Sequence, residues 1–185
     1  MKNFRDGNDT GRNPESGFTL VEMVVAAAIL LVGMTAGMTL IITAMANDSR
    51  SKNDSSATIL SQMTIETIAA VPANATTSMT VVDCNPTTSS ASHTINTTGS
   101  SGGAGATLTG GVIDFTAGTV SGYAMTYYGC QASTSDRQLT YDVRWNIKTL
   151  SSDAKLVTVA AKPIAGSTHA NFLAVPVTLK MIVGL

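Results

Sequence analysis

A long apolar run near the N-terminus constrains this chain more than any other feature. The run extends from Phe18 to Ala46, and Glu22 is its only ionisable side chain. Because about 20 consecutive apolar residues suffice for a helix to cross a bilayer, this run is long enough to span a membrane. A carboxylate inside such a segment costs roughly 2.5–3.5 kcal/mol at the helix centre and less near its end. A residue this costly indicates a function, so Glu22 is the first candidate site residue.

The apolar run opens with a specific motif, Gly17-Phe18-Thr19-Leu20-Val21-Glu22. A small residue, an aromatic residue, a carboxylate and an apolar helix in this order resemble the processing site of type IV prepilins and type II secretion pseudopilins. The resemblance covers about Gly17 to Ala46. It implies that a prepilin peptidase cuts between Gly17 and Phe18 and methylates the new amine of Phe18. It also implies that Glu22 serves subunit assembly, by pairing with the Phe18 amine of a neighbouring subunit.

Residues 1–17 do not have the pattern of a standard secretory signal, in which a basic start is followed by an apolar core and a cleavage site. Here a polar segment with three basic and three acidic side chains comes before the apolar run. One interpretation is a cytoplasmic tail that stays attached. The resemblance implies instead a leader peptide, residues 1–17, that is removed. Basic residues on either side of the run give only a weak orientation bias, so the inside placement of the leader rests on the resemblance.

The composition excludes several classes of function. The chain has 185 residues with 11 basic and 12 acidic side chains, so it lacks the basic balance of a nucleic-acid binder. Its two cysteines, Cys84 and Cys130, are predicted to form a disulfide if they face an oxidising compartment, and two free thiols are the alternative. No CxxC or Cys/His cluster occurs, so we expect no metal site and no cofactor.

The apolar run is predicted to be the first half of a longer helix, from Phe18 to Val71. Residues 18–46 form the transmembrane or filament-core part, and residues 47–71 an amphipathic continuation. The polar patch at 47–56 fits either a solvent-facing helix or a local break. A stripe at helical spacing predicts the buried face of the second half, and Pro72 ends the helix. The stripe consists of Leu60, Met63, Ile68 and Val71.

Residues 72–185 are predicted to form a β-rich head. Strict alternation of apolar and polar residues from Leu139 to Lys148 predicts a half-buried strand, which turns at 151–153 into an antiparallel partner at 156–160. Further strands are expected at 79–82, 112–115, 123–128 and 172–183, the last an edge strand because of Pro176. Residues 86–105, rich in Ser, Thr and Gly, are expected to be a mobile surface loop in which His93 is solvated. The fold class is α+β, and the resemblance implies the pilin fold, with an antiparallel sheet packed on the distal half of the helix.

No convincing catalytic set is present, so we do not expect an enzyme. Four carboxylates on the expected strands or turns have no partner at a recognisable spacing, and His169 is isolated in a loop. The letters Gly-x-Ser-x-Gly at 99–103 lack the strand and helix that a nucleophile elbow needs. The four carboxylates are Asp114, Asp136, Asp142 and Asp153.

These observations favour a structural subunit, most specifically a minor pilin of a type IV pilus. Leu31 and Thr39 stand where major pilins usually carry a glycine and a proline, and the hairpin that contains Trp145 resembles the closing hairpin of minor pilins of the pilus-modification group. The alternatives are a type II secretion pseudopilin and, from another class, a membrane-anchored adhesin or binding module that does not polymerise. The resemblance implies an inner-membrane location before assembly. It also implies three kinds of partner, namely the prepilin peptidase, other pilin or pseudopilin subunits and the inner-membrane assembly platform.

Overall fold

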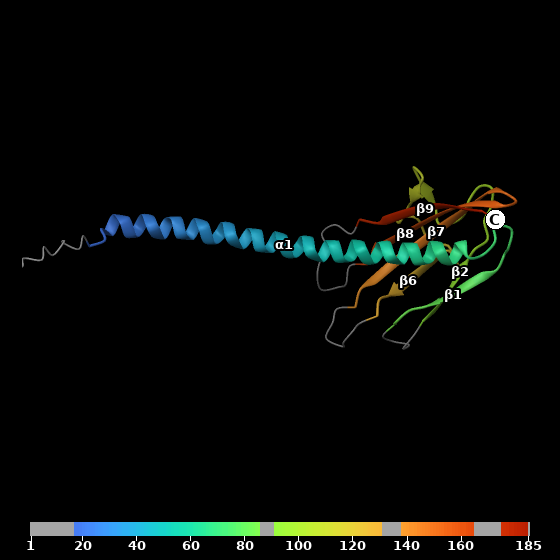
Figure 1. Ribbon diagram of the computed structural model, residues 1–185, viewed down its shortest axis with the longest axis horizontal. Helices are drawn as coiled ribbons and strands as arrows, with labels where there is room; N and C mark the ends of the chain where they lie inside the picture. Colours follow the sequence, from blue (N-terminus) through green and yellow to red (C-terminus); the bar gives the residue numbers. More distant parts are fainter. Residues whose placement is uncertain (1–16, 86–90, 131–137, 165–174, 185) are drawn as a thin grey trace, which may run out of the picture. The chain divides into compact units, whose positions relative to one another are not determined.

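The computed structural model describes residues 17–85, 91–130, 138–164 and 175–184. The chain divides into two compact units, Met1–Ala46 and Asn47–Leu185, and the boundary falls where the sequence changes from apolar to polar. One helix, α1, extends from Leu20 to Ala69 (Figure 1). The strands follow in the order β1 (Ser78–Val82), β2 (Ser92–Asn96), β3 (Ala104–Gly105), β4 (Leu108–Thr109), β5 (Val112–Ile113), β6 (Ala124–Tyr128), β7 (Thr140–Ser151), β8 (Ala154–Pro163) and β9 (Val177–Gly184).

The polar patch at 47–56 is part of α1 and not a break. Lys52 and Asp48 form an ion pair one turn apart with a nitrogen–oxygen distance of 2.8 Å, and Arg50 and Asp54 form another at 3.7 Å. Exposed pairs of this kind add only about 0.3–0.5 kcal/mol each, but they favour the helix over a break. The helix ends two residues before the predicted Val71, because Pro72 cannot continue it and a tighter turn closes it, in which the Val71 amide bonds the Ile68 carbonyl.

The distal half of α1 packs on the sheet through the predicted stripe. Leu60, Ile68 and Val71 are buried, and Met63 packs against the same core. The polar Ser61 and Thr64 are also fully buried, which the apolar pattern did not predict. The Thr64 hydroxyl bonds the Leu60 carbonyl at 2.9 Å, so its burial leaves no orphaned donor.

The sheet beneath the helix has five antiparallel strands, in the order β3-β7-β8-β9 with β6 also paired to β7 (Figure 1). The predicted hairpin is confirmed, with Trp145 opposite Val159 in the β7–β8 register. The prediction that only one face of β7 is buried was wrong, because Arg144 and Asn146 on the other face are also buried. On the predicted core face, four alternate side chains are almost completely buried in the core that includes α1. These are Tyr141, Val143, Trp145 and Ile147. The strand after Pro176 pairs with β8 and forms an edge of the sheet.

The opposite face of the sheet carries a smaller core under the β4–β5 hairpin. Gly110 and Gly111 both have positive φ angles, 60° and 81°, as the tight turn of a two-residue hairpin requires. Behind this hairpin the Arg144 guanidinium bonds both oxygens of the Asp142 carboxylate at 2.8–3.0 Å and stacks 5.0 Å from the centre of the Phe115 ring. The expectation that Asp142 is an unpaired carboxylate was therefore wrong, since a residue two positions along the same strand face reaches it.

The expectation of a surface loop at 86–105 was wrong at 92–96 and 104–105, where the chain forms strands. Residues 92–96 form β2, which pairs antiparallel with β1, and the Ile95 side chain opposite Met79 is fully buried. Non-local bonds attach this two-stranded sheet to the main one: the Trp145 indole donates to the Asn96 carbonyl at 3.0 Å and the Tyr123 hydroxyl to the Thr98 carbonyl at 2.8 Å. A segment with one large apolar residue is ordered here because distant partners satisfy its backbone.

The end of α1 is held by a buried lysine from β8. Lys155 is only 1% exposed, and its ammonium donates to the Val71 carbonyl at 3.0 Å. The last turn of α1 contains no basic side chain of its own. A cation beside these free carbonyls is favourable because it complements the helix dipole. Burial lowers the pKa of Lys155, so this bond carries a desolvation cost that the helix end offsets.

We predict that Trp145→Phe destabilises the head. The Asn96 carbonyl loses its donor, which costs about 1–3 kcal/mol, and the smaller ring leaves a cavity that adds to this loss. Urea unfolding of the full chain in detergent measures the change. Val82→Ala, at a side chain 58% exposed, is the control and should shift stability by less than about 0.5 kcal/mol. A Trp145→Phe variant as stable as this control would contradict the attachment of β2 through Trp145.

Candidate processing and assembly site

The predicted cleavage point lies just outside the helix. Thr19 caps α1, because its hydroxyl and its carbonyl both accept a hydrogen bond from the Glu22 amide, at 3.3 and 3.1 Å. Gly17 and Phe18 precede the helix and are exposed. A Cβ added to Gly17 would meet no atom within 4 Å, so the fold itself does not require glycine there. Any demand for a small residue at Gly17 comes from outside the described chain.

Glu22 lies in the first turn of α1 and is exposed. A carboxylate at this position is favourable for the helix, because the unpaired amides of the first turn leave partial positive charge there. Within residues 17–85, 91–130, 138–164 and 175–184, Glu22 forms no ion pair. The carboxylate is therefore free to bind a cation that this part of the chain does not supply.

The apolar surface beyond Glu22 is uncovered. The large apolar side chains between Phe18 and Met45 are 51–81% exposed. Among the described residues, α1 is the one helix that by length and composition could cross a membrane. An uncovered apolar surface of this length requires lipid or other protein chains around it, because water solvates it poorly.

Three threonines inside the apolar segment keep their hydroxyls satisfied within the helix. Thr35, Thr39 and Thr43 each donate to a carbonyl three or four residues earlier, at 2.8–3.1 Å. Such internal bonds remove the cost of placing a hydroxyl in hydrocarbon or in a dry protein core. The threonines are therefore compatible with a cover that contains no water.

Comparison with known families matches this N-terminal segment. Residues 12–38 match the model of the prokaryotic N-terminal methylation motif. The chain carries a prepilin-type N-terminus. This motif is that of type IV pilins and pseudopilins, which are structural subunits, and it implies processing by a prepilin peptidase and assembly with other subunits. No curated protein and no solved structure matches the chain.

The β-rich head contains a disulfide between its two cysteines. Cys84, just after β1, is bonded to Cys130, just after β6, with their Cα atoms 5.0 Å apart. This is the pair expected from the sequence, and it closes a loop of 46 residues. A crosslink of this span contributes roughly 4 kcal/mol in the chain-entropy model.

Asp83, which directly precedes Cys84, was not identified from the sequence as a candidate site residue. Its side chain is completely buried, and its Oδ2 lies 2.9 Å from Nε2 of His93, which is only 19% exposed. The expectation that His93 is solvated was therefore wrong. Positions 93 and 95 lie on the same face of β2, and the buried Ile95 gives a weak period-two signal for that face. Burial raises the pKa of Asp83, but hydrogen bonds from His93 and the amides of Tyr128 and Ala91 outweigh it, so its pKa is below the ordinary value.

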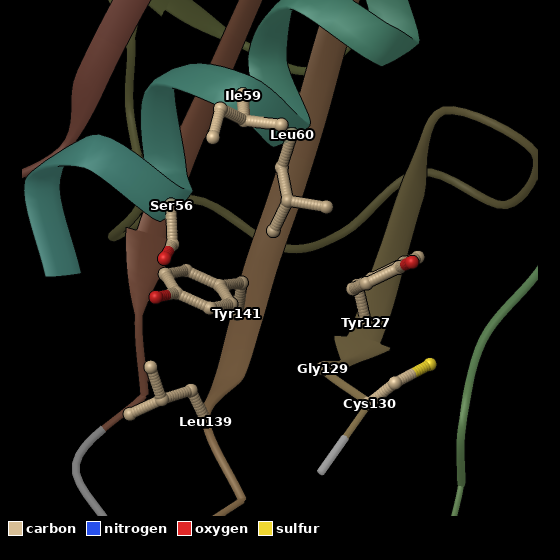
Figure 2. Close-up of a pocket in the computed structure, with 8 residues that line it drawn as sticks. All are labelled: Ser56, Ile59, Leu60, Tyr127, Gly129, Cys130, Leu139 and Tyr141. Atoms are coloured by element: carbon tan, nitrogen blue, oxygen red, sulfur yellow. The ribbon is translucent and has the colours of Figure 1, made fainter. Parts of the chain in front are cut away.

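A pocket of about 250 Å³ opens between α1 and the ends of β6 and β7 (Figure 2). Its wall contains the buried Tyr141 hydroxyl, which has no hydrogen-bond partner among the described residues. Burial raises the pKa of Tyr141. The described lining contains neither a carboxylate nor an imidazole, so it provides no acid–base pair. The lining residues are Ser56, Ile59, Leu60, Tyr127, Gly129, Cys130, Leu139 and Tyr141.

The remaining candidates for chemistry do not gather into a site. Asp114 accepts hydrogen bonds from the amide and the hydroxyl of Thr116, and Asp153 accepts one from Ser152, so both serve local turns. Asp136 and His169 lie outside the described residues. Among the described residues, no group of three potential metal ligands is present.

Proposed function

We propose that this chain is a minor pilin, a structural subunit that enters a type IV pilus through its N-terminal helix. The observation that carries this proposal is the uncovered apolar half of α1 with a single carboxylate in its first turn. A lipid bilayer can cover the apolar surface, but its hydrocarbon core offers the Glu22 carboxylate no cation. A filament core built of identical helices covers the surface and also brings other N-termini close to Glu22.

The processing step supplies the missing cation. Cleavage between Gly17 and Phe18 creates an amino group four residues before Glu22, and N-methylation leaves that amine able to carry a positive charge. A charge buried without its partner costs several kcal/mol, whereas a paired amine and carboxylate offset each other's desolvation. The Phe18 amine of one subunit paired with Glu22 of its neighbour therefore sets the axial register of the helices.

We predict that the mature chain begins at Phe18 and that Phe18 is N-methylated. Mass spectrometry of protein recovered from membranes measures the N-terminus. Gly17→Val should leave residues 1–17 attached without disturbing the fold, because a side chain at position 17 meets no neighbour. A host without active prepilin peptidase is the second control. A wild-type chain that keeps residues 1–17 in a host with active peptidase would refute the processing proposal.

We predict that Glu22→Ala blocks assembly but not membrane insertion. Removing the carboxylate lowers the cost of insertion by up to roughly 3 kcal/mol and leaves the neighbouring amine unpaired in the core. The two quantities to compare are processed protein in the inner membrane and protein in sheared fibres. Glu66→Ala, at an exposed carboxylate on the distal half of the same helix, is the matched control and should assemble normally.

The comparison of Glu22→Ala with Glu66→Ala distinguishes loss of the register pair from loss of stability. A normal membrane pool with few subunits in fibres supports the register pair. If Glu22→Ala enters fibres as well as the Glu66→Ala control does, Glu22 does not set the register. If both pools fall together, the defect is one of stability, and the register pair is rejected as its cause.

The first alternative is a type II secretion pseudopilin, which uses the same helix and the same motif. The second is an inner-membrane adhesin that crosses the membrane once and never polymerises. Processing after Gly17 is common to the pilin and the pseudopilin, and loss of secretion rather than of surface fibres in a deletion strain would favour the pseudopilin. For both the pilin and the pseudopilin, the proposed partners are the prepilin peptidase, other subunits and the inner-membrane assembly platform. In both roles the chain is a structural subunit and not an enzyme.

A further inference from the structure

The side chain of Asp83 is bonded to three separate segments of the head. Its Oδ1 accepts hydrogen bonds from the amides of Asn85 and Ala91, at 3.2 and 3.1 Å. Its Oδ2 accepts one from the Tyr128 amide at 2.9 Å and lies 2.9 Å from Nε2 of His93. The carboxylate therefore bonds the chain just after β1, the segment that enters β2 and the end of β6.

The bond to Tyr128 replaces a backbone bond of the kind found between paired strands. The Cys84 amide donates to the Tyr128 carbonyl at 3.1 Å, as in an antiparallel ladder. The reciprocal acceptor for the Tyr128 amide is the Asp83 side chain instead of a main-chain carbonyl. In this way the two-stranded β1–β2 sheet is attached to the end of β6, although no strand pairing connects β1 with β6.

This attachment brings the two half-cystines together. Cys84 follows Asp83 directly, and Cys130 comes two residues after Tyr128, so the Asp83–Tyr128 bond lies beside the Cys84–Cys130 bond. Gln138 strengthens the same junction, because its amide donates to the carbonyls of Cys84 and Gly129, at 2.6 and 3.2 Å.

We propose that Asp83 is the positioning residue of the Cys84–Cys130 disulfide. Its buried carboxylate fixes the end of β1 against the end of β6, and so holds the two thiols at bonding distance before they are oxidised. The oxidation itself transfers two electrons from the thiols to a disulfide oxidant. With oxidised glutathione, the protein dithiol becomes a disulfide and two molecules of reduced glutathione are released, so atoms and electrons balance.

Asp83→Asn tests this role with almost no change of shape. Each carboxylate oxygen accepts from at least one backbone amide, so an Asn side chain in either orientation directs its NH₂ at a backbone donor. A change in the tautomer of His93 does not relieve this conflict. At least one buried amide is left without an acceptor, which disfavours the closed junction between β1 and β6.

The experiment measures the equilibrium between the full chain in detergent and a glutathione redox buffer, with the oxidised fraction read by thiol alkylation and mass spectrometry. We expect the equilibrium constant for disulfide formation to fall by about ten- to a hundredfold in Asp83→Asn, the fold-change that corresponds to one unpaired buried amide. Asp142→Asn is the control, because it disrupts the hydrogen-bonded Asp142–Arg144 pair on the opposite face of the sheet. Its equilibrium constant should stay within about threefold of wild type, as expected for a distant, independent site.

Fluorescence of Trp145, the one tryptophan of the chain, verifies that each reduced variant is still folded. If reduced Asp83→Asn is unfolded, His93→Ala provides the test, because it removes one partner of Asp83 and keeps the carboxylate that accepts from the backbone amides of Asn85, Ala91 and Tyr128. A several-fold fall is then expected. An unchanged equilibrium constant in the folded Asp83 variant, or in His93→Ala where that variant is used, would overturn the proposal. An equal fall in Asp142→Asn would also overturn it, because the effect would then reflect general loss of stability.

Discussion

The uncovered apolar surface of the first half of α1 is the constraint on which the rest of this protein depends. A helix with this composition is stable only when lipid or other apolar helices surround it, because the cost of exposing apolar surface to water rises with its area. The internal hydrogen bonds of Thr35, Thr39 and Thr43 satisfy the same requirement, since a dry environment does not tolerate free hydroxyls. Glu22 is the one ionisable side chain in the segment, and neither lipid hydrocarbon nor the described part of its own chain supplies it with a cation.

The second half of the same helix needs neither lipid nor a neighbouring chain to cover its apolar side chains. It is amphipathic, and the sheet covers its apolar stripe within one copy of the chain. Lys155 bonds the carbonyl at its distal end, and exposed ion pairs stabilise its first turns. The head therefore packs on one half of α1, and the described chain leaves the apolar other half of the same helix uncovered.

Elements with a local, periodic signal could be predicted from the sequence. The β7–β8 hairpin alternates apolar and polar residues over a full strand, and the prepilin motif is contiguous, so both are visible in short windows. The strand β2 was missed because Ile95 is its only large apolar residue, and its order depends on Met79 and Trp145, which are distant in the sequence. The buried Asp83–His93 pair and the bond from Lys155 to the end of α1 were missed for the same reason. A buried polar group becomes recognisable only when its partner is known, and these partners come from other elements.

In the proposed filament, helices of other subunits replace lipid around the apolar half of α1. A photoreactive diazirine amino acid in place of Ile29, whose side chain is 68% exposed, reports directly what surrounds this surface. In cells that lack filament assembly, we expect crosslinks to lipid alone. In cells that assemble filaments, we expect additional crosslinks to the N-terminal helices of other pilin-type subunits. Crosslinks to lipid alone in both kinds of cell would contradict the proposal that α1 enters a filament, and would favour a membrane anchor that never polymerises.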